Sequence, residues 1–220
     1  FFNINEATEA YNSIVASGSN ACILHYIKNE SILKDGKLLL TDAGCEYEYY
    51  ASDITRTIPI NGKFSPYQKQ VYSIVLTAQQ AAIKQCLAGN TLQDIHSTAV
   101  KEITKGLISI GLLKGSLVRN INNGEYKKFY MHNTGHWMGL DVHDPSDYVE
   151  DDKPIKLKPG MVFTVEPGIY IKPSKSVDKK YHNIGIRIED DILITTSAPE
   201  ILTRDAPKTI EDIEETMSLN

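Results

Sequence analysis

Residues 41–57, TDAGCEYEYYASDITRT, hold two aspartates in one short segment. The apolar run KLLL precedes them, and alternating residues follow Tyr49, which predicts a β-hairpin. With its turn centred between Tyr47 and Glu48, Asp42 is expected directly opposite Asp53, with Cβ atoms about 4.5–5.5 Å apart. Because two carboxylates that close repel each other, the arrangement requires a positive charge nearby.

A second acidic pair repeats this arrangement later in the chain. Residues 161–171, MVFTVEPGIYI, and residues 184–195, which begin IGIRIEDD, are predicted strands joined by a charged loop. A symmetric register places Glu166 opposite Glu189. Both have apolar neighbours, so exposure to solvent does not explain them, and buried like charges are costly without a cation.

Histidines cluster between the two predicted hairpins. The segment HNTGHWMGLDVHD contains His132, His136 and His143. Carboxylates combined with imidazole suit Mn²⁺, Co²⁺ or Zn²⁺. Two such ions about 3.5–4 Å apart, bridged by carboxylates, form a common hydrolytic centre. The sequence therefore predicts a divalent metal site to which at least one of these histidines contributes.

Two helices are expected between the hairpins. The first begins with Pro66, whose fixed φ suits the first turn, and its apolar repeat ends at Gly89. The second begins after Thr91 and stops at Gly111. A polar loop is expected near residues 114–127. Strands, two helices and then more strands indicate an α+β fold with antiparallel pairing.

These motifs resemble the aminopeptidase P family, the Xaa-Pro aminopeptidases of the wider pita-bread metallopeptidases. The resemblance runs from about residue 11 to the C-terminus and is carried by ILHY, DAGCEYEYYASDITRT, HNTGHWMGLDVHD, TVEPGIYI and GIRIEDD. It implies the pita-bread fold, a curved antiparallel sheet covered by helices. It also implies that residues 1–220 are a catalytic domain without the family's separate amino-terminal domain and first catalytic-domain helices.

The resemblance implies five metal ligands and two divalent ions, with Mn²⁺ expected and Co²⁺ or Zn²⁺ as alternatives. Asp42 is the implied bidentate ligand of one ion, and Asp53 and Glu189 are the implied bridges. His136 and Glu166 are the implied ligands of the other ion. Glu166 is also expected to handle the proton of the attacking water.

Further residues are assigned roles by the same resemblance. His132 and His143 are expected to hold the substrate and stabilise the tetrahedral intermediate. His25, in ILHY, is expected at the pocket beyond the scissile bond, and Arg187 matches the family's active-site arginine. The predicted catalytic residues are thus His132, His143, Glu166 and Arg187, and the predicted substrate-binding residues are His25, His132, His143 and Arg187.

The implied reaction is removal of an N-terminal residue that precedes proline, so peptides with proline in the second position are the expected substrates. Trp137 and Tyr170 are expected as apolar walls for the proline ring. Two alternatives stay open: a prolidase that cleaves Xaa-Pro dipeptides, since prolidase shares GLDVHD-like and EPGIY-like segments, and a non-catalytic pita-bread binding module.

Composition limits the remaining classes of function. The chain has 220 residues, 41% of them hydrophobic, and a net charge of −5, which argues against a surface devoted to nucleic acid. No apolar run reaches the length of a membrane span. Cys22, Cys45 and Cys86 show no CxxC spacing, which favours reduced thiols and a cytoplasmic location. A homo-oligomer is expected for the full-length protein.

Overall fold

The computed structural model describes residues 2–218 and has the expected α+β organisation, with antiparallel pairing in every sheet. The α-helices are α1 Pro66–Ile83, α2 Leu92–Ser109, α3 Leu117–Asn122 and α4 Ile210–Ser218. The 3-10 helices are Phe2–Asn5, Gly18–Cys22, Glu125–Lys128 and Lys179–Tyr181. The strands are β1 Thr8–Glu9, β2 Ile14–Ser17, β3 Leu38–Asp42, β4 Cys45–Tyr47, β5 Tyr50–Ala51, β6 Thr55–Pro59, β7 Val149–Glu150, β8 Lys153–Pro154, β9 Val162–Val165, β10 Gly168–Ile171, β11 Ile184–Arg187, β12 Asp190–Leu193 and β13 Glu200–Ile201.

Both long helices begin at capping boxes. Ser65 accepts a hydrogen bond from the backbone of Gln68, whose side chain accepts one from the backbone of Ser65. Thr91 and Asp94 make the same reciprocal pair at the start of α2. The predicted helix starts are confirmed, whereas α1 ends at Ile83, before the glycine expected to stop it.

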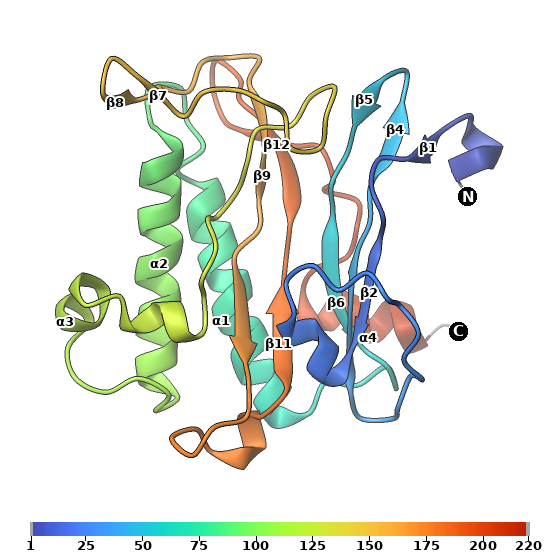
Figure 1. Cartoon of the computed structure of the whole chain (residues 1–220), viewed down its shortest axis with the longest axis vertical. Helices are drawn as coiled ribbons and strands as arrows, with labels where there is room; N and C mark the ends of the chain where they lie inside the picture. The colour runs from blue at the N-terminus through green and yellow to red at the C-terminus, as the bar shows by residue number, and fades with distance from the viewer. Residues whose placement is uncertain (1, 219–220) are drawn as a thin grey trace.

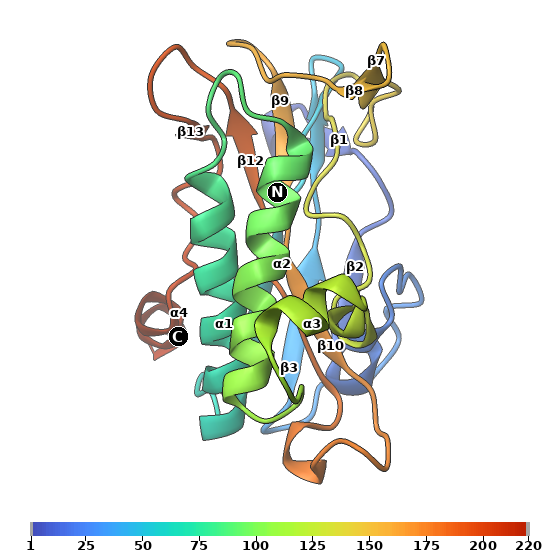
Figure 2. The same cartoon turned by 90° about the vertical axis from the view of Figure 1, so that its left-hand side faces the viewer.

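The two long helices form one layer, seen face-on in Figure 2, and the strands lie behind them. They pack closely because Gly106 of α2 has no side chain: a Cβ there would lie 2.3 Å from Cγ2 of Ile74. Helix α1 also contacts β9, β10 and β11. Residues of these helices and of the strands that they cover make up the main apolar core. Figure 1 shows the helices beside β9 and β11. This layer supports the second hairpin from outside the site.

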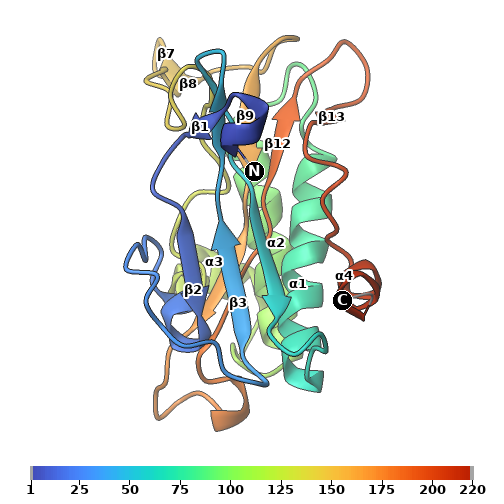
Figure 3. The ribbon, with the colours of Figure 1, turned by 90° about the vertical axis from the view of Figure 1, so that its right-hand side faces the viewer.

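The first hairpin contains β3, β4, β5 and β6, and β2 pairs with the outer side of β3 (Figure 3). Its register differs from the predicted one. Asp42 lies opposite Thr55, and Asp53 precedes Thr55 by two residues, on the side of the turn. The cause is the turn, since Glu48 and Tyr49 both have positive φ, 49° and 72°. This is the backbone of a two-residue turn centred between these two residues. The predicted pairing of Asp42 with Asp53 was therefore wrong.

The second hairpin has the predicted register. Val165 pairs with Asp190 on one side of the acidic pair, and Gly168 pairs with Arg187 on the other. Glu166 and Glu189 occupy the facing positions between these two ladders. The hairpins are joined where the backbone N–H of Glu189 donates to the carbonyl of Thr55 at 3.1 Å. Both acidic pairs thus face the same space.

Several elements were not expected from the sequence. The predicted polar loop at 114–127 contains α3, which Ser116 caps by accepting a hydrogen bond from the backbone N–H of Arg119. Helix α4 lies beside α1, and β7 and β8 form a small exposed hairpin. Within residues 2–218, no helix combines the length and apolar character needed to cross a membrane.

Candidate metal centre

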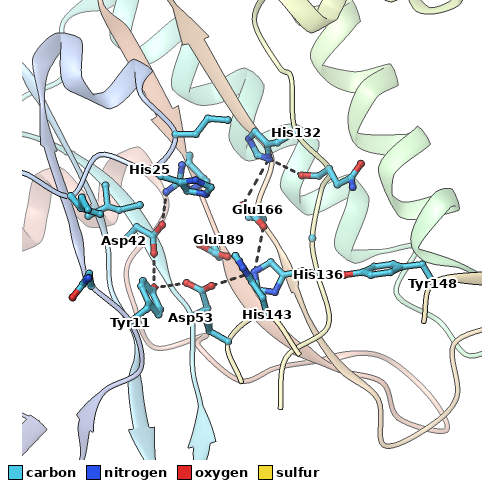
Figure 4. A pocket seen from close by; sticks show the side chains of 18 residues that line it. Tyr11, His25, Asp42, Asp53, His132, His136, His143, Tyr148, Glu166 and Glu189 are labelled. Carbon is cyan, nitrogen blue, oxygen red and sulfur yellow. Dashed lines mark hydrogen bonds and ion pairs between the residues drawn. The ribbon is translucent and has the colours of Figure 1, made fainter. Parts of the chain in front are cut away.

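A cavity of about 520 Å³ lies between the two hairpins and residues 132–136, which form the HNTGH loop. Figure 4 shows its side chains pointing toward one another from both sides. All nine predicted site residues line this cavity: His25, Asp42, Asp53, His132, His136, His143, Glu166, Arg187 and Glu189. The sequence therefore identified a set of residues that the fold brings together.

Asp42 and Asp53 meet at the hydroxyl of Tyr11, which the sequence analysis did not identify. Tyr11 Oη lies 2.5 Å from Oδ1 of each carboxylate, although its single proton can serve only one of them at a time. Pairing of β2 with β3 brings Tyr11 here, since Ile14 lies opposite Asp42. Burial raises the pKa of Asp42, Arg187 opposes that shift, and Asp53 adds to it.

His136 presents a lone pair to the carboxylates. Its Nδ1 lies 3.0 Å from the carbonyl oxygen of Trp137 and donates a hydrogen bond to it. Nε2 is therefore the nitrogen whose lone pair can bind a cation. Nε2 lies 3.3 Å from Asp53 Oδ2 and 3.7 Å from Glu166 Oε1. Burial opposes a charge on this ring, but the Asp53 hydrogen bond and Glu166 outweigh it, so the pKa of His136 is raised. The ring therefore favours a bound cation or proton at this point.

The HNTGH loop reaches this position because Gly135 has no side chain. A Cβ at Gly135 would lie 1.8 Å from the carbonyl oxygen of Thr164 on β9. The loop continues the sheet there, since the backbone N–H of Thr164 donates to the carbonyl of His136 at 3.0 Å. This close approach fixes His136 against the hairpin that carries Glu166.

Glu189 is buried and held by Thr55, whose hydroxyl donates to Oε2 at 2.5 Å. Burial raises the pKa of Glu189 well above its usual value, and the carboxylates of Asp53 and Glu166 raise it further. Nearby, Asp191 Oδ2 accepts the backbone N–H of Asp53 at 3.1 Å. Within residues 2–218, Asp191 Oδ1 is the buried side-chain polar atom without a hydrogen-bond partner.

Glu166 has the titration expected of a proton carrier near neutral pH. Burial raises its pKa to about 7, against the lowering effect of Arg187 and His136. Asp53 and Asp42 add to the increase. A cation or a proton would therefore stabilise this group of buried carboxylates.

His132 has both ring nitrogens engaged within the protein. Nδ1 donates to the carbonyl of Asn133 at 2.7 Å, so Nε2, 2.9 Å from Tyr170 Oη, accepts the tyrosine proton. The tyrosine oxygen in turn accepts a hydrogen bond from Arg187. Burial and Arg187 lower the pKa of His132 to about 3, so the ring is neutral.

Arg187 lies among the carboxylates rather than at the mouth of the cavity. It is 4% exposed and donates to Asp42 Oδ2 at 2.5 Å and to Thr55 Oγ1 at 3.0 Å. His25 and His143 are the exposed histidines of the cavity, and the His143 ring lies 4.3 Å from the His136 ring. These two are the histidines whose position suits direct contact with a substrate.

The two predicted apolar walls lie elsewhere. Trp137 is buried against Phe163 and lines a second cavity, and its indole N–H donates to Asp147. Tyr170 is 1% exposed and bonds His132 and Arg187 through its hydroxyl. The prediction that both form walls around the proline ring was wrong. Leu24, Ile27 and Val142 are the apolar side chains that do line the site cavity.

The residues present fit a divalent metal centre. Donor atoms of Asp53, His136 and Glu189 all lie within 4.8 Å of one another. Four carboxylates surround this point, and the oxygen-rich set with one imidazole is the one that Mn²⁺, Co²⁺ or Zn²⁺ accepts. The raised carboxyl pKa values and the lone pair of His136 both indicate missing positive charge at the same place.

Comparison with known proteins identifies the family of this chain. Residues 2–196 match metallopeptidase family M24, and the chain belongs to this family. Its fold is the pita-bread fold of its structural neighbours, so the fold predicted from the motifs is confirmed.

Among the relatives, the similarity is to Xaa-Pro aminopeptidases, which confirms the resemblance drawn from the motifs. The chain is 51% identical to the Xaa-Pro aminopeptidase of Haemophilus influenzae over 95% of its own length, and 47% identical to that of Escherichia coli over 94%. It superposes on Pseudomonas aeruginosa aminopeptidase PepP with a TM-score of 0.98 and 50% identity, covering 99% of this chain. The chain spans about half the length of these relatives, 48%, 47% and 50% respectively.

Proposed function

We propose that the protein containing this chain is a metal-dependent aminopeptidase that removes the N-terminal residue preceding proline. The observation that carries the proposal is the convergence of four carboxylates and the free Nε2 of His136 on one cavity. The similarity to Xaa-Pro aminopeptidases supports the choice of substrate.

Two divalent ions, with Mn²⁺ favoured and Co²⁺ or Zn²⁺ as alternatives, are the proposed cofactors. Asp42, Asp53, His136, Glu166 and Glu189 would hold them. When bound, such ions polarise the scissile carbonyl and make water acidic enough to act as a nucleophile near neutral pH. The carboxylates then remain ionised because the ions supply the missing positive charge.

The remaining residues act through position and proton transfer. Glu166 is the proposed proton carrier: from its place beside His136 it would take a proton from water and pass it to the leaving nitrogen. His143 and His25 face the cavity from the exposed side and are the proposed substrate contacts. His132 would contact substrate by giving up its bond to Tyr170, and Arg187 would hold Asp42 in place.

An exopeptidase must also recognise the free amino end of its substrate. The carboxylates around the metal site are the proposed partners of this ammonium group, as hydrogen-bond acceptors. Cys22, Cys45 and Cys86 are free thiols, which supports a reducing compartment such as the cytoplasm as the place of action.

The test measures how well the native polypeptide, in the presence of Mn²⁺, cleaves different peptide substrates. Xaa-Pro-Xaa tripeptides should be cleaved well, and the matching Xaa-Ala-Xaa and N-acetylated peptides poorly. Release of the N-terminal amino acid is the measurement. Cleavage confined to Xaa-Pro dipeptides would establish a prolidase instead, and a protein that binds these peptides without cleaving them would be a binding module.

A further inference from the structure

A hydrogen-bond chain behind the HNTGH loop connects helix α2 to the second hairpin, which carries Glu166. His96, a half-buried residue on α2, lies with Nδ1 2.9 Å from Thr134 Oγ1. The hydroxyl of Tyr130 lies 2.6 Å from the same oxygen. The backbone carbonyl of Thr134 accepts the N–H of Glu166 at 2.7 Å. Thr134 therefore links His96 directly to the residue proposed to carry the proton.

The direction of the protons follows from burial. Tyr130 is fully buried, and an undonated hydroxyl in that position would be costly, so it donates to Thr134. Thr134, itself 2% exposed, has one proton left to donate, and His96 Nδ1 is the acceptor within reach. Burial lowers the pKa of His96, which keeps the ring neutral and Nδ1 available as an acceptor.

The hydrogen-bond chain from His96 to Glu166 lies outside the substrate cavity. His96, Thr134 and Trp137 line a separate cavity of about 220 Å³ on the opposite side of the HNTGH loop. The loop carries His132 and His136 on its other side, where His132 Nδ1 and His136 Nε2 lie 3.9 Å and 3.7 Å from the Glu166 carboxylate. A shift of Thr134 would move these three side chains relative to one another.

We propose that His96 is a positioning residue for the metal centre. By accepting a hydrogen bond from the Thr134 hydroxyl, it fixes the loop that positions Glu166 relative to His132 and His136. Its effect on turnover rests on the proposed peptidase function, whereas its effect on metal binding does not. A bond that only stabilised the fold would lower the melting temperature of the protein without changing the site in the folded state.

The experiment measures kcat and KM on an Xaa-Pro-Xaa peptide and, separately, the Kd of Mn²⁺ alone by isothermal titration calorimetry. For His96→Ala we expect kcat to fall and the Mn²⁺ Kd to rise by about fivefold each, the value of one ordinary hydrogen bond. KM should stay unchanged. His96→Asn, whose amide oxygen can replace Nδ1 as acceptor, should restore both values.

Two controls separate positioning from stability. His182→Ala removes another half-buried histidine, whose Nε2 bonds the backbone carbonyl of Val177 at 2.9 Å, and should leave kcat and the Mn²⁺ Kd unchanged. Thr134→Val removes the hydroxyl at the other end of the hydrogen-bond chain and also leaves the buried Tyr130 hydroxyl without its acceptor, so its effect on kcat and the Mn²⁺ Kd should be at least as large as that of His96→Ala. Thr134→Ser keeps the hydroxyl and should behave as the native protein.

Unchanged kcat and Mn²⁺ Kd in His96→Ala, with a melting temperature lowered as in His182→Ala, would overturn the proposal. If His96→Ala does not fold, the comparison of Thr134→Val with Thr134→Ser decides in the same way. If the native polypeptide cleaves no Xaa-Pro peptide, the proposed function fails, and the Mn²⁺ Kd still tests the role of His96.

Discussion

Replacing Thr55 by valine should weaken metal binding about 10–100-fold. The hydroxyl of Thr55 donates to Glu189 Oε2 at 2.5 Å, and this bond favours the ionised carboxylate that a metal requires. In the metal-free site the pKa of Glu189 is raised, so the bond is strongest when the metal is present. A hydrogen bond to a charged group is worth about 1.5–3 kcal/mol, which corresponds to about one to two powers of ten in Kd.

The assay is calorimetric titration of the metal-free protein with Mn²⁺, and Thr57→Val is the matched control. Thr57 lies two residues further along β6, is equally buried, and bonds the backbone of Arg187 at 3.0 Å and 3.2 Å. Its replacement should lower stability but leave the Mn²⁺ Kd unchanged. Native-like Mn²⁺ affinity in Thr55→Val, or equal losses in both variants, would refute the reasoning.

Three further predictions concern the same site. In EDTA, the free energy of unfolding of the native chain, measured relative to that of Glu166→Gln, should decrease between pH 4.5 and about 7. The reason is that the folded state still holds a proton on Glu166 that the unfolded carboxyl has released. Urea titrations at both pH values measure this difference, and an increase would contradict the prediction. Free Mn²⁺ at 100 times its Kd should raise the melting temperature by about 5–10 °C, since such binding contributes about 2.7 kcal/mol; no shift would argue against a structural link between metal and fold. Gly135→Ala should lower the free energy of unfolding by more than about 4 kcal/mol, because its Cβ would lie 1.8 Å from the Thr164 carbonyl oxygen. Gly111→Ala, in open space at a φ of +78°, should lower it by about 1–2 kcal/mol. Equal losses in urea titrations would show that the loop adapts.

The sequence predicted the second hairpin better than the first. Glu166 and Glu189 lie in the expected register because the apolar runs of β9, β10 and β11 identify the strands clearly on both sides of the acidic pair. In the first hairpin the register depends on its turn. Glu48 and Tyr49 adopt positive φ although neither is glycine or asparagine, so the composition of that turn gave no signal for its position.

Residues that act through tertiary contacts were the ones missed. Tyr11 reaches Asp42 and Asp53 only because β2 pairs with β3. His96 reaches Thr134 only because α2 packs behind the HNTGH loop. Neither has a neighbour in sequence that suggests its role. The metal-site motifs were recognisable because each carries several functional residues within one short segment.

The most direct test of the metal centre is an anomalous difference map from a crystal of the native polypeptide soaked in Mn²⁺. We expect two manganese ions in the cavity, both bound by the set Asp42, Asp53, His136, Glu166 and Glu189. Manganese bound elsewhere, or none in this cavity at saturating Mn²⁺, would contradict the account.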